Sequence, residues 1–238
     1  MRLGLILLAA GRGTRFGRSK VDLPILGRPV IAHALDCFAG VAGLEQRLVV
    51  VAPDDVEAAR ERWAEVLEAS GAQVCAGGLE DRWASVVAAL EALDEGITHV
   101  LIHDAARPCV STETVGRVVS ALGQDGAVIP GVAVSSTLKR VGDAVREGVR
   151  VMGEGVERDG LIEVQTPQGF EVALLRRGFV GVLEDLRSGR AHVTDDASVV
   201  ERLGERVVVV EGDTGNVKIT RPGDELVAEA ILRARGVE

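Results

Sequence analysis

Short aliphatic runs alternate with segments of helical character along this chain. Residues 3–8 are continuously apolar, which is typical of a strand covered on both faces of a parallel sheet. The expected strands are residues 3–8, 47–51, 73–75, 100–103 and 127–130, and the expected helices are residues 29–38, 54–70, 82–93 and 112–122. This alternation predicts right-handed βαβ units, and therefore an α/β fold with a Rossmann-like, mostly parallel sheet flanked by helices.

One stretch interrupts the alternation. Residues 137–156 read TLKRVGDAVREGVRVMGEGV, which is two β-branched stretches around a Gly/Asp turn with little to bury on one side. We expect a protruding β-hairpin arm that leaves the main sheet. No linker rich in Pro, Gly or Ser marks a second domain, so we expect residues 1–238 to form one domain.

The first apolar run ends in a glycine-rich, cationic loop. Residues 7–20 read LLAAGRGTRFGRSK, and three glycines alternate there with arginines before Lys20. Glycines let a backbone approach a phosphate closely, so we interpret the loop as a phosphate cradle; a plain turn between a strand and a helix is the alternative. The spacing fits neither a Walker A loop nor the dinucleotide fingerprint, which argues against a nicotinamide dehydrogenase.

The distribution of charge also points to a small anionic ligand. The net charge of −9 argues against nucleic acid or an anionic membrane as a partner, yet residues 1–21 contain five cationic residues and no acidic one. The apolar run at residues 3–10 is too short to span a bilayer. Three cysteines without CxxC spacing suggest neither a disulfide framework nor a zinc site, and they favour a cytoplasmic location.

Two further loops follow expected strands, where open α/β sheets bind their ligands. Residues 77–86, GGLEDRWASV, supply Arg82 and Ser85, either to a ligand or merely to a turn and a helix start. In HDAARP, Asp104 follows a strand directly, where a carboxylate can hold a ribose hydroxyl or Mg²⁺; a local salt bridge to Arg107 is the alternative. We interpret His103 as a buried residue at the end of a strand rather than as a base.

The remaining polar stretches are dispersed in the second half of the chain. They are Arg158, QTPQGF at 165–170, TDDA at 194–197 and GNVKIT at 215–220. In TDDA the polar residues could simply cap the helix that follows. The chain has 24 arginines and only three lysines, so Lys20 and Lys218 in candidate phosphate loops suggest a need for a compact ammonium charge.

Together these stretches resemble the 2-C-methyl-D-erythritol 4-phosphate cytidylyltransferases of the non-mevalonate isoprenoid pathway. The resemblance spans nearly the whole chain and is carried, in order, by LAAGRGTRFG, GG…R…SV, HDAARP, TLKRV, QTPQGF, TDDAS and GDTGNVKITRPGD. The second loop departs from the usual family spacing by one extra residue before Arg82, and the first loop is shorter than usual.

The resemblance implies a fold of the nucleotide-diphospho-sugar transferase type and a set of site residues. It makes Arg15 and Lys20 the pair that stabilises the transition state, and Arg158 and Lys218 the pair that positions methylerythritol phosphate. The other implied residues are Ala9, Ala10, Gly11, Gly13, Gly77, Arg82, Ser85, Asp104 and Ala105 for CTP, Arg107, Thr137, Thr166 and Thr194 for the sugar phosphate, and Asp104 and Asp213 for Mg²⁺. Thr137 would come from the partner chain of a homodimer formed through the arm.

The implied reaction is attack by a phosphate oxygen of methylerythritol phosphate on the α-phosphorus of CTP, with departure of pyrophosphate. A phosphomonoester is already largely ionised at neutral pH, so no protein base is required. Magnesium and fixed cations would offset the negative charge that develops. A ribitol 5-phosphate cytidylyltransferase and a catalytically dead nucleotide-binding regulator are the alternatives.

Overall fold

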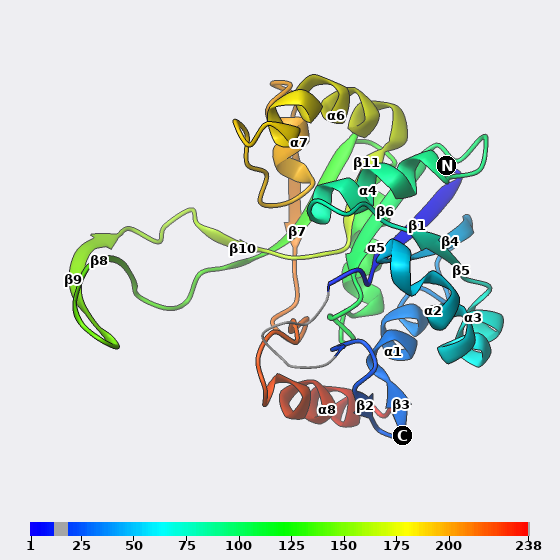
Figure 1. Ribbon diagram of the computed structural model, residues 1–238, viewed down its shortest axis with the longest axis horizontal. Helices are drawn as coiled ribbons and strands as arrows, with labels where there is room; N and C mark the ends of the chain where they lie inside the picture. Colours follow the sequence, from blue (N-terminus) through cyan, green and yellow to red (C-terminus); the bar gives the residue numbers. More distant parts are fainter. Residues whose placement is uncertain (12–18, 238) are drawn as a thin grey trace.

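A central β-sheet organises the protein. The computed structural model describes residues 1–11 and 19–237. Within them, eight strands form the sheet, seven of them in the order β10-β7-β11-β6-β1-β4-β5, while β12 pairs with β7 (Figure 1). The strands are β1 (Leu3–Leu8), β4 (Leu44–Val51), β5 (Gln73–Ala76), β6 (His99–Asp104), β7 (Ala127–Ala133), β10 (Ile162–Val164), β11 (Gln168–Glu171) and β12 (Val208–Glu211).

One half of the sheet is parallel, which confirms the predicted fold class. β1 pairs in parallel with β4 and β6, and β4 pairs in parallel with β5. The carboxyl ends of these strands therefore lie along one edge of the sheet. The expected strands at 3–8, 47–51, 73–75, 100–103 and 127–130 all fall within observed strands.

The other half contains strand pairs that the apolar pattern did not predict. β11, from the QTPQGF stretch, lies antiparallel between β6 and β7, and β10 is antiparallel to β7. β12 then adds to β7 in parallel. These strands have only three or four residues each, too few for a periodicity to be recognised.

Helices cover both faces of the sheet. They are α1 (Val30–Asp36), α2 (Val56–Arg62), α3 (Ala64–Ser70), α4 (Arg82–Glu91), α5 (Thr112–Leu122), α6 (Val172–Arg187), α7 (Ala197–Glu201) and α8 (Asp224–Ala234), with a 3-10 turn at Pro53–Asp55. Ser111 caps α5 by accepting a hydrogen bond from the Thr114 amide, as its position predicts. The prediction of a continuous helix over 54–70 is wrong, because Trp63 leaves the helical conformation between α2 and α3 and buries its ring.

The core divides at the sheet. Alternate residues of β1 point to opposite faces: Leu5 and Leu7 pack with α1, α2, α3 and α5, whereas Ile6 packs with α4, α6 and α7. A smaller apolar cluster joins α8 to the short β2 (Pro24–Ile25), which pairs with β3 (Arg28–Pro29). α8 is thus held against the region that follows the first loop.

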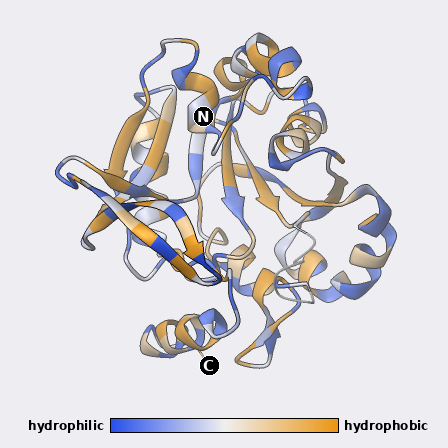
Figure 2. Cartoon of the chain, turned by 60° about the vertical axis from the view of Figure 1, so that its left-hand side comes forward, coloured by the Kyte–Doolittle hydropathy of each residue, from blue (hydrophilic) through white to orange (hydrophobic). Residues whose placement is uncertain are grey.

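The predicted arm is present as a separate hairpin. β8 (Leu138–Arg146) and β9 (Val149–Val156) pair only with each other in the described sheets, and they project away from the rest of the molecule (Figure 1). Figure 2 shows apolar and polar residues alternating along both strands. Val141 and Met152 are 61% and 71% exposed, so apolar side chains of the arm lie uncovered in the single chain.

No described helix is both long enough and apolar enough to cross a bilayer. Cys37, Cys75 and Cys109 are free thiols.

Candidate active site

A cavity of about 440 Å³ opens at the carboxyl edge of the parallel strands. Its walls come from the segments that directly follow β1, β4, β5 and β6, together with the 218–219 segment before α8. The described lining residues that carry the argument are Ala9, Ala10, Gly11, Lys20, Gly78, Arg82, Ser85, Asp104 and Lys218. The position is the one that the fold class predicts for a ligand.

The first wall begins where β1 ends. The Ala9 amide donates to the Val50 carbonyl at 2.8 Å, which continues the ladder one residue beyond the strand. Gly13 and Arg15, predicted for CTP and for the transition state, lie outside the described residues. Lys20 returns to the cavity wall, and its carbonyl accepts from the Leu23 amide.

Asp22 anchors the end of this segment. Its Oδ1 accepts from Trp63 Nε1 at 2.7 Å and lies 3.1 Å from Arg62 Nε. Arg62 also lies over the Trp63 ring, with its guanidinium carbon 4.7 Å from the ring centroid. The junction of α2 and α3 therefore holds the backbone two residues after Lys20.

The second wall is the glycine pair before α4. A Cβ on Gly78 would come within 2.3 Å of Ala84 Cβ, and one on Gly77 would come within 2.6 Å of Ser85 Oγ. Only glycine permits this close approach between the loop and the helix. Gly78 rather than Gly77 lines the cavity, with Ser85 beside it.

Asp104 is the charged centre of the cavity. Its Oδ2 lies 2.7 Å from Lys218 Nζ and 3.7 Å from Arg107 Nε, and its Oδ1 lies 3.5 Å from Arg82 Nε. Burial alone would raise the pKa of this carboxyl, but the three cations outweigh burial and hold its pKa far below the usual range. Asp104 is therefore ionised. The local salt bridge to Arg107, which was the alternative interpretation of Asp104, is present as a long contact within this cluster.

Two hydrogen bonds to backbone carbonyls bring Lys218 to Asp104. The Ile219 amide donates to the Ala106 carbonyl at 2.8 Å, and Arg107 Nη1 donates to the Asn216 carbonyl at 2.8 Å. The GNVKIT stretch thus runs beside HDAARP although the two are about a hundred residues apart in sequence. Ala105, predicted for CTP, is buried, and Ala106 lines the cavity in its place.

Hydrogen bonds of His103 and Thr166 hold the backbone from Asp104 to Arg107 in place. His103 Nε2 lies 3.1 Å from the Arg107 carbonyl, which can only accept, so Nε2 carries the proton. Nδ1 then accepts from Thr166 Oγ1 at 2.9 Å, and the same oxygen accepts from the Asp104 amide at 3.2 Å. Burial lowers the pKa of His103 to about 4, so the ring is a neutral brace and not an exposed base.

Arg82 makes a contact that the sequence did not reveal. It forms two close contacts with the buried carboxylate of Asp196: Nη1–Oδ1 at 2.9 Å and Nη2–Oδ2 at 2.8 Å. The helix cap, one of the two interpretations of TDDA, is present: Asp195 accepts a hydrogen bond from the Ser198 amide at the start of α7. The sequence did contain one sign of a second role: two acidic residues precede α7, and one carboxylate is enough to cap a helix.

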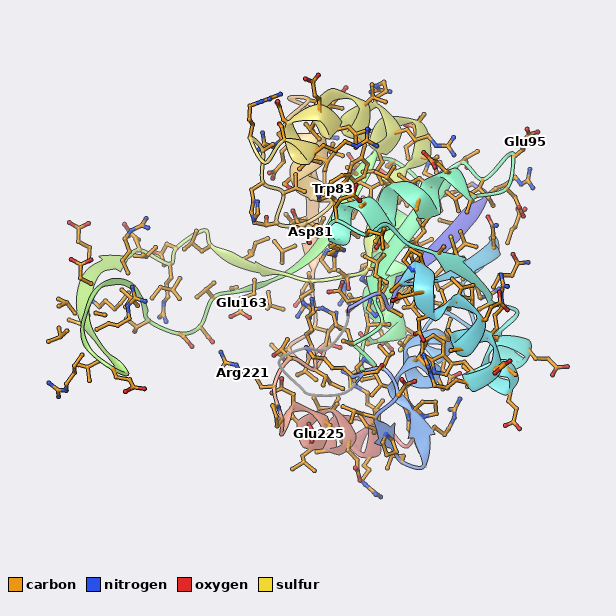
Figure 3. The ribbon with its side chains drawn as sticks, in the orientation of Figure 1. Asp81, Trp83, Glu95, Glu163, Arg221 and Glu225 are labelled. Atoms are coloured by element: carbon orange, nitrogen blue, oxygen red, sulfur yellow. The ribbon has the colours of Figure 1, made fainter. Side chains whose placement is uncertain are left out.

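A second cavity, of about 470 Å³, adjoins the first through Lys218. Arg107, Glu163, Gln165 and Asp224 also line it. Figure 3 shows Glu163 on the flank from which the arm leaves, with Arg221 on the same flank near the start of α8, while Asp81 and Trp83 mark the start of α4 above them.

Three predicted substrate residues line neither of these cavities in the described chain. Thr137 and Arg158 are exposed at the base of the arm, where Arg158 donates to the Ser135 carbonyl, and Thr194 is exposed before α7. Thr166 is buried beneath Asp104. A single chain therefore brings Lys20, Arg82, Asp104 and Lys218 together, but it does not add these residues to them.

The two predicted metal carboxylates lie apart. Asp213 belongs to another cavity, accepts from the Gly215 amide at 2.7 Å and pairs with Arg235 at 2.7 Å. No group of three or more acidic, His or Cys side chains that could hold a metal occurs among the described residues. Of the two predicted carboxylates, Asp104 is the one that suits Mg²⁺, because this ion commonly takes one or two protein carboxylates and completes its shell with waters and substrate phosphates.

Comparisons with known proteins agree on one family. The profile of 2-C-methyl-D-erythritol 4-phosphate cytidylyltransferase matches residues 3–234. Proteins of that name from Cereibacter sphaeroides and Acidobacterium capsulatum are 40% and 36% identical, over 98% and 99% of this chain and 97% and 99% of their own length. The crystal structure of the Thermus thermophilus protein of the same name is 35% identical, covers 98% of this chain and 100% of its own, and superposes with a TM-score of 0.76.

Proposed function

The chain belongs to the 2-C-methyl-D-erythritol 4-phosphate cytidylyltransferase family, and we propose that the cavity at the ends of β1, β5 and β6 is where it acts. The enzyme transfers the cytidylyl group of CTP to 2-C-methyl-D-erythritol 4-phosphate, and the products are 4-diphosphocytidyl-2-C-methyl-D-erythritol and pyrophosphate. This reaction belongs to isoprenoid precursor biosynthesis. The observation that supports the location is the convergence of Lys20, Arg82 and Lys218 with Asp104 on one cavity.

CTP would lie across the glycine walls. The backbone around Gly11 and Gly78 lets a base and phosphates approach closely, and Ser85 offers a hydroxyl to the same cavity. Lys20 on the wall beyond Gly11 would face the negative charge that develops on the α-phosphate oxygens. We assign Arg15 the same role, although it lies outside the described residues.

The nucleophile would need no protein base. The second pKa of a phosphomonoester is about 6, so the attacking oxygen is anionic at neutral pH. The nearby imidazole, His103, is buried and both of its ring nitrogens have partners. The protein's task is therefore to bring two anions together and to offset their charge.

We propose Mg²⁺ as the metal and Asp104 as its protein ligand. Asp104 is ionised, and among the described residues its Oδ1 has only the long contact with Arg82, so we propose this oxygen as the one that receives a cation. When bound, Mg²⁺ would withdraw charge from the CTP phosphates. Asp213 is a poor second ligand because its two oxygens are occupied by Gly215 and Arg235.

The second substrate would occupy the adjoining cavity, and a partner chain would complete its site. Lys218 and Arg107 lie at that cavity and can receive a phosphate. We propose that Thr137 and Arg158 reach the site of the other protomer through a homodimer made by the arm. The uncovered valines of the arm support this assembly, since an isolated two-stranded hairpin is at best marginally stable. We also propose a cytoplasmic location, which agrees with three free thiols.

One assay tests the proposed function against its closest alternative. The enzyme would be supplied with CTP, Mg²⁺ and either 2-C-methyl-D-erythritol 4-phosphate or ribitol 5-phosphate, and release of pyrophosphate would be recorded. We expect rapid release with the first acceptor only. Pyrophosphate release that depends on ribitol 5-phosphate would instead indicate a ribitol 5-phosphate cytidylyltransferase. No pyrophosphate release with either acceptor would indicate a nucleotide-binding regulator.

A further inference from the structure

Arg82 is held between two carboxylates of unequal exposure. Its Nη atoms lie against Asp196, while its Nε atom faces Asp104 on the cavity side. The Asp196 side chain is 2% exposed and the Arg82 side chain is 30% exposed. Asp196 therefore holds the inner edge of the guanidinium and leaves the outer edge to the cavity.

Among the described residues, Arg82 is the only one with which the Asp196 side chain forms a hydrogen bond or an ion pair. It stands at the start of α7, yet its side chain makes no capping hydrogen bond. The neighbouring Asp195 does that work, and it also accepts from Gln168 Nε2 at 2.9 Å. The Ala197 amide is bound in turn by Gln168 Oε1, so β11 fixes the segment independently of Asp196.

The chemistry of the pair explains why a buried carboxylate would be kept there. One hydrogen bond and a second close ion-pair contact to the same carboxylate fix the orientation of the planar Arg82 guanidinium, whereas a single contact would leave it free to turn. A buried charge that loses its partner is strongly destabilising, so contact with another opposite charge becomes favourable. The other carboxylate that Arg82 already contacts is Asp104, the proposed metal ligand.

We propose that Asp196 is a positioning residue of the active site, which holds Arg82 away from full contact with Asp104. This inference rests on the proposed function, because it assumes that CTP binds in the cavity that Arg82 lines. Without the Asp196 charge, Arg82 closes onto Asp104 and competes for the oxygen that faces the substrate. Asp196 itself touches no reactant.

The test compares neighbouring carboxylates. The variants are Asp196→Asn, Arg82→Gln and the double variant, with Asp195→Asn as the matched control because Asp195 caps α7 without contacting Arg82 in any described contact. For each, kcat, the KM for CTP, CTP affinity by calorimetry and the melting temperature would be measured. We expect Asp196→Asn to lower kcat/KM for CTP about tenfold or more, because both the CTP-lining Arg82 and the Asp104 oxygen are displaced, and Asp195→Asn to change it less than about threefold.

The double variant separates positioning from folding. It removes both charges and so leaves no unpaired one in the interior. If Asp196 acts through Arg82, the double variant is no slower than Arg82→Gln alone, because the two changes break the same interaction. Should Asp196→Asn fail to fold, the comparison of kcat and KM between the double variant and Arg82→Gln still decides, because both lack the Arg82 charge.

Three results would overturn the inference. They are equal kinetic effects of Asp196→Asn and Asp195→Asn, defects that multiply in the double variant, or a loss confined to the melting temperature. The proposed function is judged separately on the unmodified enzyme. If that enzyme neither binds CTP nor releases pyrophosphate, the CTP site is wrong and this inference falls with it.

Discussion

At the scale of single residues, His103 shows how hydrogen bonds fix a charge state. The Arg107 carbonyl requires a proton on Nε2, and Thr166 can donate to Nδ1 only while that nitrogen is unprotonated. A second proton would remove this acceptor inside the core. The ring thus ties the Asp104 turn to Thr166 only in its neutral form.

A dependence of stability on pH follows. Burial lowers the pKa of His103 in the folded protein to about 4, against about 6.5 in an unfolded chain. Below pH 6.5 the unfolded state takes up a proton that the folded state does not, so folding is disfavoured progressively down to about pH 4. Between pH 7 and pH 5 this single group should cost about 2 kcal/mol of unfolding free energy.

His103→Gln provides the measurement. Denaturant titrations of both proteins without metal or nucleotide should show a smaller loss of stability in the variant between pH 7 and pH 5, although the variant is less stable at pH 7. The acidic limb of activity near pH 6 should persist, since it belongs to the substrate phosphate. Disappearance of that limb would make His103 a base and refute the mechanism.

The predictability of the site differs between its residues. Lys20 and Lys218 could be predicted because lysine is rare in this chain, and Asp104 could be predicted because it ends an apolar strand. The partner of Arg82 could not, because Asp196 lies 114 residues further along the chain and no local pattern links them. Tertiary packing alone creates that contact.

At the scale of elements, the Gly77–Gly78 segment and α4 approach each other closely at the cavity wall. A Cβ at Gly78 would lie 2.7 Å from the carbonyl carbon of Ala84, which is helix backbone and cannot turn aside. We expect Gly78→Ala to lower the free energy of unfolding by about 1 to 3 kcal/mol and to weaken CTP binding. Denaturant titration and calorimetry would measure the two effects.

Gly116→Ala is the matched control. Gly116 lies within α5, and a Cβ there meets no atom within 4 Å. Alanine should stabilise the helix by about 0.5 to 1 kcal/mol and leave CTP binding unchanged. Equal behaviour of the two variants would mean that the loop does not constrain the cavity.

The apolar pattern predicted the elements that are long or buried on both sides. It located β1, β4, β5 and β6 and the helices between them, apart from the break at Trp63. At that break Trp63 donates a hydrogen bond to Asp22, which lies 41 residues away, and the helical periodicity contains no sign of this contact. β11 was missed for a similar reason, because its partners, not its own four residues, make it a strand.

At the scale of the whole molecule, the proposed sharing of sites between two chains can be tested by mixing. Thr137→Val and Lys20→Ala should each be poor as homodimers, because each lacks a residue from both sites. In a heterodimer, the chain with Thr137→Val keeps its own Lys20 and would receive Thr137 from its partner. One site is then intact, so activity per isolated dimer should approach half that of the unmodified enzyme.

Tagged chains, co-expressed and separated by their two tags, would provide the heterodimer. The matched control is each variant homodimer carried through the same purification. Heterodimers no better than the average of the two homodimers would place Thr137 within its own chain's site or outside the reaction.

Because β8 and β9 pair only with each other among the described strands, hydrogen exchange in the arm can be used to follow dimer dissociation. Its backbone hydrogen bonds depend on no other described strand, so its amides can exchange with deuterium through a local opening that leaves the sheet closed. Docking on a second copy would suppress that opening. Deuterium uptake at residues 138–156, followed through a dilution series, would therefore report subunit dissociation in the unlabelled, unmodified enzyme.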